Sequence, residues 1–129
     1  FFKKKINILG GNQVRPLLHI NDMVNCYGFF IKRNITGTYN VGFENLSVRN
    51  IANSVKKIIP SKIIIKKSNV PRSYRMNSDK LLSVGFKQKF NHIDAIIDLK
   101  NKFQSGFKPS EENWNLNWLL KKKVIKKSG

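Results

Sequence analysis

The sequence GGNQVRPLLHINDM, from Gly10 to Met23, joins a glycine-rich turn to an apolar stretch and then to the start of a helix. The residues before it, Ile6–Leu9, predict a short strand. Glycine readily adopts the positive φ that a tight turn needs, so we expect Gly10-Gly11-Asn12 to reverse the chain. Gln13–Ile20 then follows as a returning strand.

Helices and short strands alternate after this stretch. Asn21 or Asp22 is expected to cap a helix, because apolar residues follow at the spacing of one helix face. These residues are Met23, Cys26, Tyr27, Phe30 and Ile31. Further expected elements are a strand at Thr38–Val41, a helix from Ser47 to Pro60, a strand at Ile63–Ile65, a loop at Ser68–Asn77, a helix at Leu81–Val84 opened by Ser78 or Asp79, and a last helix capped by Asn91. The pattern predicts a small α/β piece that packs against something larger.

Composition limits the size and the class of the protein. The chain has 129 residues, enough for one domain or part of one, and a single cysteine, so it forms no internal disulfide framework. No apolar run approaches the ~18–20 residues that cross a bilayer, and the first residues do not form a signal peptide. We therefore expect a cytoplasmic protein without membrane contact.

The chain lacks the common catalytic and phosphate-binding motifs. It contains no G-x-G-x-x-G, no P-loop and no serine in a nucleophile elbow. His19 and His92 have no metal ligands at a suitable spacing, and a histidine in an apolar strand such as LLHI is typically structural. Cys26 lies on an apolar helix face and is expected to be a small buried hydrophobe.

Arginines are scarce and therefore informative. The net charge is +18, but only 5 of the 25 basic residues are arginines, and most lysines are expected to be solvated surface. Arg15 follows the glycine turn, and Arg72 and Arg75 lie in the loop PRSYRMNSDK. Guanidinium groups bind phosphate through a fixed fork of donors. With only 7 carboxylates in the chain, we expect arginines without ion-pair partners.

Four motifs in order resemble the extended short-chain dehydrogenase/reductases, the NAD-dependent nucleotide-sugar epimerases and dehydratases. The resemblance covers about residues 6–119, although no single motif decides it. The motifs are GGNQVRPLLHINDM, GTYNVG at Gly37–Gly42 with the helix after it, RSYRMNSDK at Arg72–Lys80, and the LLSVGF segment that follows it at Leu81–Phe86. The tail NWNLNWL is also similar to the end of some members.

The resemblance implies a fold and a ligand. Residues 1–108 would be the small C-terminal substrate-binding portion of a Rossmann-fold epimerase or dehydratase, and 109–129 its tail. The ligand would be a nucleotide-diphosphate sugar, as in polysaccharide biosynthesis. Arg15 and Arg72 would contact the diphosphate, while Gln13, Val14 and Tyr74 would line the nucleotide pocket. Asp22 would cap its helix and His19 would be structural.

Two departures from the family pattern matter. The chain has no Tyr-x-x-x-Lys pair and no glycine fingerprint, so NAD and the catalytic tyrosine would belong to an N-terminal Rossmann domain that is missing here. The parent enzyme would be a homodimer formed through that domain. The chain alone is expected to be inactive, and whether the parent is an epimerase, dehydratase or reductase stays open.

A second reading is a small basic nucleic-acid-binding protein. The pI near 10.4 and nine phenylalanines favour it, as do Trp114 and Trp118, which stand one helical turn apart and could stack on bases. Scattered lysines and the ordinary use of aromatic residues in packing argue against it. We therefore expect the nucleotide-sugar reading to hold.

Overall fold

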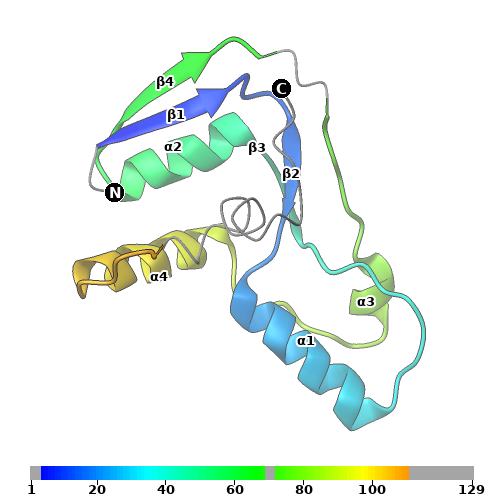
Figure 1. Cartoon of the computed structure of the whole chain (residues 1–129). Coiled ribbons are helices and arrows are strands. Elements are labelled where there is room, and N and C mark those ends of the chain that lie inside the picture. The colour runs from blue at the N-terminus through cyan, green and yellow to red at the C-terminus, as the bar shows by residue number, and fades with distance from the viewer. Residues whose placement is uncertain (1–3, 69–71, 111–129) are drawn as a thin grey trace, which may run out of the picture.

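A computed structural model describes residues 4–68 and 72–110 of the chain (Figure 1). Short strands and helices alternate, and they form a small α/β structure. In chain order the elements are β1 (Lys5–Leu9), β2 (Val14–Leu17), α1 (Ile20–Arg33), β3 (Glu44–Ser47), α2 (Val48–Ile58), β4 (Lys62–Lys66), α3 (Asp79–Ser83) and α4 (His92–Gln104). The predicted tail, including Trp114 and Trp118, lies outside the described residues from position 111 onward.

The strands form two separate pairs, which corrects the predicted hairpin. β1 pairs in parallel with β4, and β2 pairs in antiparallel fashion with β3. Gly10 and Gly11 do turn the chain, with φ of 73° and 124°. The turn redirects the chain instead of reversing it: the Gly10 N–H extends the β1–β4 ladder to the Lys66 carbonyl, and the Gly11 carbonyl accepts from the Arg49 N–H at the start of α2.

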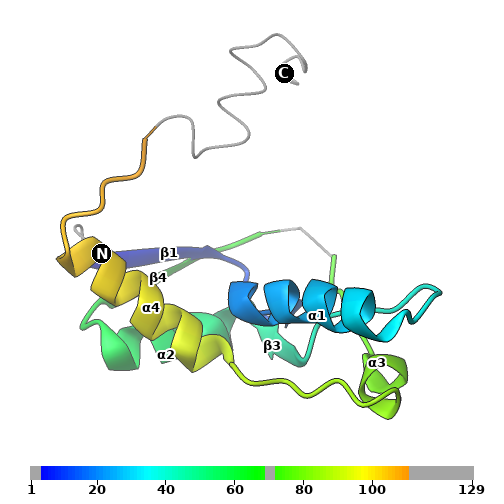
Figure 2. The same cartoon turned by 90° about the horizontal axis from the view of Figure 1, so that it is seen from below.

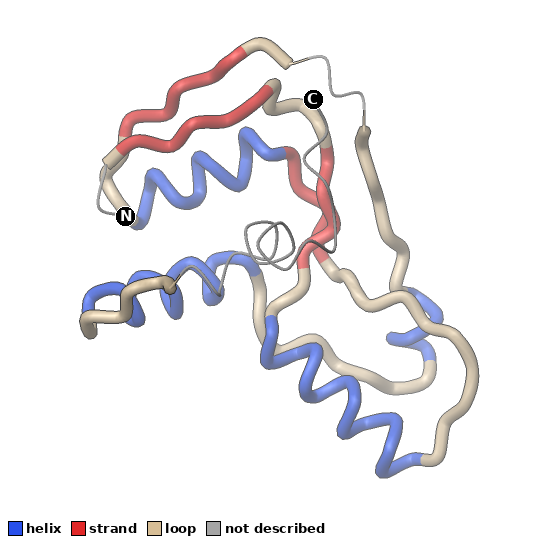
Figure 3. Tube along the Cα trace, viewed as in Figure 1, coloured by secondary structure: helices blue, strands red, loops and turns tan. Residues whose placement is uncertain are grey.

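Helix α2 packs against the β1–β4 pair (Figures 1 and 3). Ser47 caps the helix as predicted, and its hydroxyl accepts a hydrogen bond from the Asn50 N–H at 3.1 Å. The cap satisfies one of the donors that a helix start leaves unpaired. Ala52 from the helix and Ile8 from β1 are both buried in the structure.

A second apolar cluster joins α1 to α3 and to the segment that precedes α4. Its buried members are Cys26, Leu81 and Phe86, and Phe29 lies edge-on to Phe86 at 5.4 Å between ring centroids. Cys26 is therefore a buried hydrophobe, as predicted. Its burial raises the pKa of the thiol, because the apolar surroundings disfavour the thiolate.

The start of α1 differs from the prediction. His19, not Asn21 or Asp22, is the N-cap, and its Nδ1 accepts from the Asn21 N–H at 3.2 Å. Asp22 is fully buried, and its carboxylate accepts hydrogen bonds from the backbone N–H groups of Lys89 and Phe90. The Asp22 side chain thus holds the segment between α3 and α4 in place. It makes long-range hydrogen bonds and does not cap its own helix.

Two further expectations for this region are wrong. Thr38–Val41 is not a strand: no ladder partner for it exists among the described residues, and its neighbour Gly42 bonds instead to the Ser78 hydroxyl at 3.0 Å. Tyr27 and Ile31, predicted on the buried face of α1, are 63% and 81% exposed. Tyr27 and the segment Tyr39–Val41 line the same surface hollow beside α1.

The ends of the later helices follow local signals. Asn91 caps α4 and forms a capping box with Asp94, and Ser78 precedes α3 as expected. Figure 1 shows α4 on the side of α2 away from β1, and Figure 2 shows α4 crossing α2. No helix in the described part of the chain has the length and apolar character to span a bilayer.

Candidate functional site

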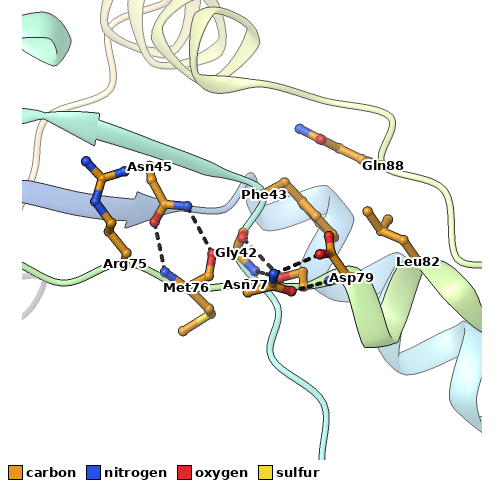
Figure 4. A pocket seen from close by; sticks show the side chains of 10 residues that line it. Gly42, Phe43, Asn45, Arg75, Met76, Asn77, Asp79, Leu82 and Gln88 are labelled. Carbon is orange, nitrogen blue, oxygen red and sulfur yellow. Dashed lines mark hydrogen bonds between the residues drawn. The ribbon is translucent and has the colours of Figure 1, made fainter.

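The loop that carries Arg72 and Arg75 lies along the free edge of β2. The Tyr74 N–H donates to the Val14 carbonyl at 3.0 Å, and the Val14 N–H donates to the Ser73 hydroxyl at 2.9 Å. The Asn45 side chain bonds both backbone groups of Met76, at 2.9 and 3.0 Å (Figure 4). Because β3 flanks β2 on its other side, the two strands and the loop form one platform.

The guanidinium of Arg15 is held on this platform by hydrogen bonds and a ring contact. Its Nη1 donates to the carbonyl oxygens of Val14 and Arg72, at 2.8 and 2.7 Å, and its guanidinium lies 5.3 Å from the centroid of the Tyr74 ring. These bonds use the two Nη1 hydrogens of the five N–H donors that a guanidinium carries. The remaining donors, on Nε and Nη2, have no partner among the described residues, and they form a fork that fits an oxyanion.

The other residues expected at the site have different positions. Arg72 is exposed, and its carbonyl bonds to Arg15. Tyr74 is 53% exposed and lies under Arg15. Gln13 is engaged in the glycine turn, since its Oε1 accepts from the Gly11 N–H and its Nε2 donates to the Leu9 carbonyl. Gln13 therefore supports the turn that precedes Arg15, and Val14 joins the site through its backbone.

A pocket of about 460 Å³ opens beside the platform (Figure 4). One wall is the loop from Arg75 to Asp79, and another is the segment from Gly42 to Asn45. Gly42 packs closely against the loop: a Cβ at this position would lie 2.9 Å from the Met76 sulfur, so that side chain would have to shift. Arg75 brings a third arginine to the site, although the resemblance assigned the diphosphate to Arg15 and Arg72 alone.

The sequence predicts arginines without ion-pair partners. The ion pairs of the described residues join His19 to Asp98 and His92 to Glu44, and neither includes Arg15, Arg72 or Arg75. Asn45, which holds the loop in place, was missed. No sequence signal identifies it, since its partner Met76 is 31 positions away.

The described residues thus form a small α/β unit with an arginine-bearing platform beside a pocket. Among solved structures, the chain is similar to a GDP-D-glycero-L-gluco-heptose synthase from Campylobacter jejuni, determined in the presence of NADPH. The TM-score is 0.66 at 20% sequence identity, and the match covers 79% of this chain and 34% of that one. The chain thus spans about a third of the length of that enzyme. No family model and no curated protein matches the sequence.

Proposed function

We propose that the chain is the nucleotide-sugar-binding portion of an NAD-dependent epimerase or dehydratase. The observation that carries the proposal is the fixed guanidinium of Arg15, with an unused donor fork at the edge of a platform that also holds Arg72. A diphosphate presents oxygens that match such forks. The fold likeness to a synthase of GDP-linked heptose supports the same ligand class.

In this proposal the chain binds and orients the substrate. Arg15 and Arg72 would hold the diphosphate, while the ring of Tyr74 would support the guanidinium of Arg15. Arg75 and the polar groups of the neighbouring pocket would contact the rest of the ligand. Binding at a part of the substrate that does not react positions the sugar and so lowers the cost of reaching the transition state.

The cofactor would be bound elsewhere. The sequence contains no glycine-rich strand-turn-helix, so its residues do not fit a dinucleotide. NAD, which supplies transient hydride transfer at the sugar in such enzymes, would be held by a Rossmann domain outside this chain. Dimerisation of the complete enzyme would involve that domain as well.

The surface of α1 supports a Rossmann domain as the partner. Four apolar side chains form a stripe along the helix, here called the α1 stripe, and they are 62–81% exposed: Ile20, Val24, Tyr27 and Ile31. No lysine or arginine occurs between Arg15 and Lys32, although the chain has 25 of them. The segment Thr38–Val41 beside this stripe has no strand partner among the described residues. An uncharged apolar stripe in this position is suited to packing on a sheet of another domain.

Binding of a nucleoside diphosphate tests the ligand proposal. We expect Arg72→Ala to weaken binding of GDP or UDP by roughly 1.5–3 kcal/mol, the usual value of a charged hydrogen bond. Isothermal titration calorimetry of the 129-residue chain measures it. Lys32→Ala is the matched control, because it removes the same charge from the exposed end of α1.

Three outcomes of this titration contradict the proposal. Unchanged affinity in Arg72→Ala removes that residue from the site. Equal losses in both variants indicate unspecific attraction of anions to a basic protein. Tighter binding of an oligonucleotide than of either diphosphate, with steep salt dependence, would favour the nucleic-acid reading.

The α1 stripe makes a separate prediction. In the chain alone, Val24→Gln with Ile31→Gln is expected to lower the fluorescence of a neutral solvatochromic dye about twofold, because exposed apolar area is lost. The free energy of unfolding should change by less than about 0.5 kcal/mol, as expected for surface sites. Leu99→Gln, which alters an exposed leucine of α4, is the control and should leave most of the signal. Undiminished fluorescence in the double variant would show that the stripe is not the dye-binding surface.

A further inference from the structure

Three side chains that are far apart in the sequence meet where β3, α2 and α4 come together. His92, at the start of α4, lies between Glu44 of β3 and Ser54 of α2. Its Nδ1 is 2.7 Å from Glu44 Oε1, and its Nε2 is 3.0 Å from the Ser54 hydroxyl oxygen. Both side chains of the His92–Glu44 pair are partly shielded, with exposures of 18% for His92 and 24% for Glu44. From Ser54 through His92 to Glu44, the three side chains have the arrangement of a nucleophile, a base and a carboxylate that orients the base.

The hydrogen bonds assign the tautomer of His92. A carboxylate only accepts hydrogen bonds, so Nδ1 carries the hydrogen and the neutral ring presents the lone pair of Nε2 to the serine hydroxyl. Glu44 also accepts the backbone N–H of His92 through Oε2, at 2.6 Å. One carboxylate therefore fixes both the backbone and the ring. The base is held in the orientation that proton transfer from Ser54 requires.

Ser54 is reachable from outside. It is half-buried and lines an open surface hollow of about 560 Å³, together with Asn50, Asn53, Lys56 and Lys57. Backbone N–H groups in a helix interior are bonded to carbonyls one turn before, so they cannot stabilise an oxyanion next to Ser54. The side-chain amides of Asn50 and Asn53 have no partner among the described residues, and an asparagine amide can serve this purpose.

We propose that Glu44, His92 and Ser54 form a second site, which hydrolyses carboxylic esters that carry an anionic group. The Ser54 oxygen forms a bond to the ester carbonyl carbon, and its proton passes to His92 Nε2. The carbon–oxygen bond to the leaving group breaks as His92 returns the proton to the alkoxide. Water then attacks the acyl-serine in the same manner and releases the acid and free Ser54. Lys56 and Lys57 beside the hollow select the anionic substrates.

The test uses the full chain and a fluorophosphonate probe, with the labelled residue mapped by mass spectrometry. We expect label on Ser54, none in Ser54→Ala at that position, and a rate roughly 100-fold lower in His92→Gln, the usual contribution of a general base. Glu44→Gln should slow labelling while leaving Ser54 the labelled residue. Ser83→Ala, which removes an exposed serine of α3, should label as the original chain does. Alanine is the strongest helix former, so Ser54→Ala does not endanger α2.

Ester hydrolysis gives the second readout. The chain should release nitrophenol from the 4-nitrophenyl monoester of succinate faster than from 4-nitrophenyl acetate, and Lys57→Ala should remove that preference. Label spread over several serines, or labelling of Ser54 that is unaffected in His92→Gln, would overturn the proposal. Equal hydrolysis by Ser54→Ala would also overturn it, since lysine side chains would then account for the release.

Discussion

Asp22→Ala is expected to lower the free energy of unfolding by about 3–5 kcal/mol, because two partly buried backbone donors lose a charged, fully buried acceptor. The carboxylate accepts from the Lys89 N–H at 3.1 Å and from the Phe90 N–H at 2.9 Å. It is fully buried, so water cannot replace it without opening the structure. Urea unfolding followed by circular dichroism measures the loss.

Asp22→Asn is the control for this effect. Oδ2 accepts from both N–H groups, and an amide keeps one uncharged oxygen that can take this place. The variant should therefore retain both bonds in a weaker, neutral form and lose about half as much stability. A loss below about 1 kcal/mol in Asp22→Ala would mean that the Lys89–Phe90 backbone finds other partners.

Leu81→Ala is expected to cost about 2–5 kcal/mol, the range for a leucine removed from a packed core. Leu81 has 0% exposure and joins Cys26 and Phe86 in the cluster between α1 and α3. The short helix α3 offers few other buried contacts to hold it. Thermal or urea unfolding of the variant gives the value.

The neighbouring leucine is a matched control. Leu82 stands in the same helix but is 43% exposed, so Leu82→Ala should cost less than about 1 kcal/mol. Similar losses in the two variants would contradict the placement of the core, because the two changes remove the same atoms from one helix.

Local features of the fold could be predicted from the sequence, and long-range ones could not. The caps at Ser47 and Asn91 follow from a polar residue before an apolar period, and both are present. The partner of β2 depends on where the chain goes after the Gly10–Gly11 turn. Glycines permit that turn without specifying its direction. Asp22 looked like a cap because its true partners are 67 and 68 positions away.

The candidate site shows the same division. The arginines at Arg15 and Arg72 were found from residue type and resemblance, and the structure brings them together through the Arg72 carbonyl. The tasks of Gln13 and Asn45 depend on backbone geometry that residue types do not encode. The grouping of Glu44, Ser54 and His92 was missed for a related reason: the three residues lie on separate elements, so no spacing along the chain reveals them.

The parallel pairing of β1 with β4 affects how the chain folds during its synthesis. Lys5 pairs with Lys62, so β1 emerges from the ribosome on the order of 3–11 seconds before its partner, at ordinary rates of elongation. During that interval the backbone groups of Ile6 and Ile8 lack the partner strand to which they hydrogen-bond in the folded structure. Lys4 and Lys5 beside them discourage contact with other nascent chains, because charge at a strand edge opposes aggregation. The first strand of the sequence thus remains without its partner strand until Lys62–Lys66 has been synthesised.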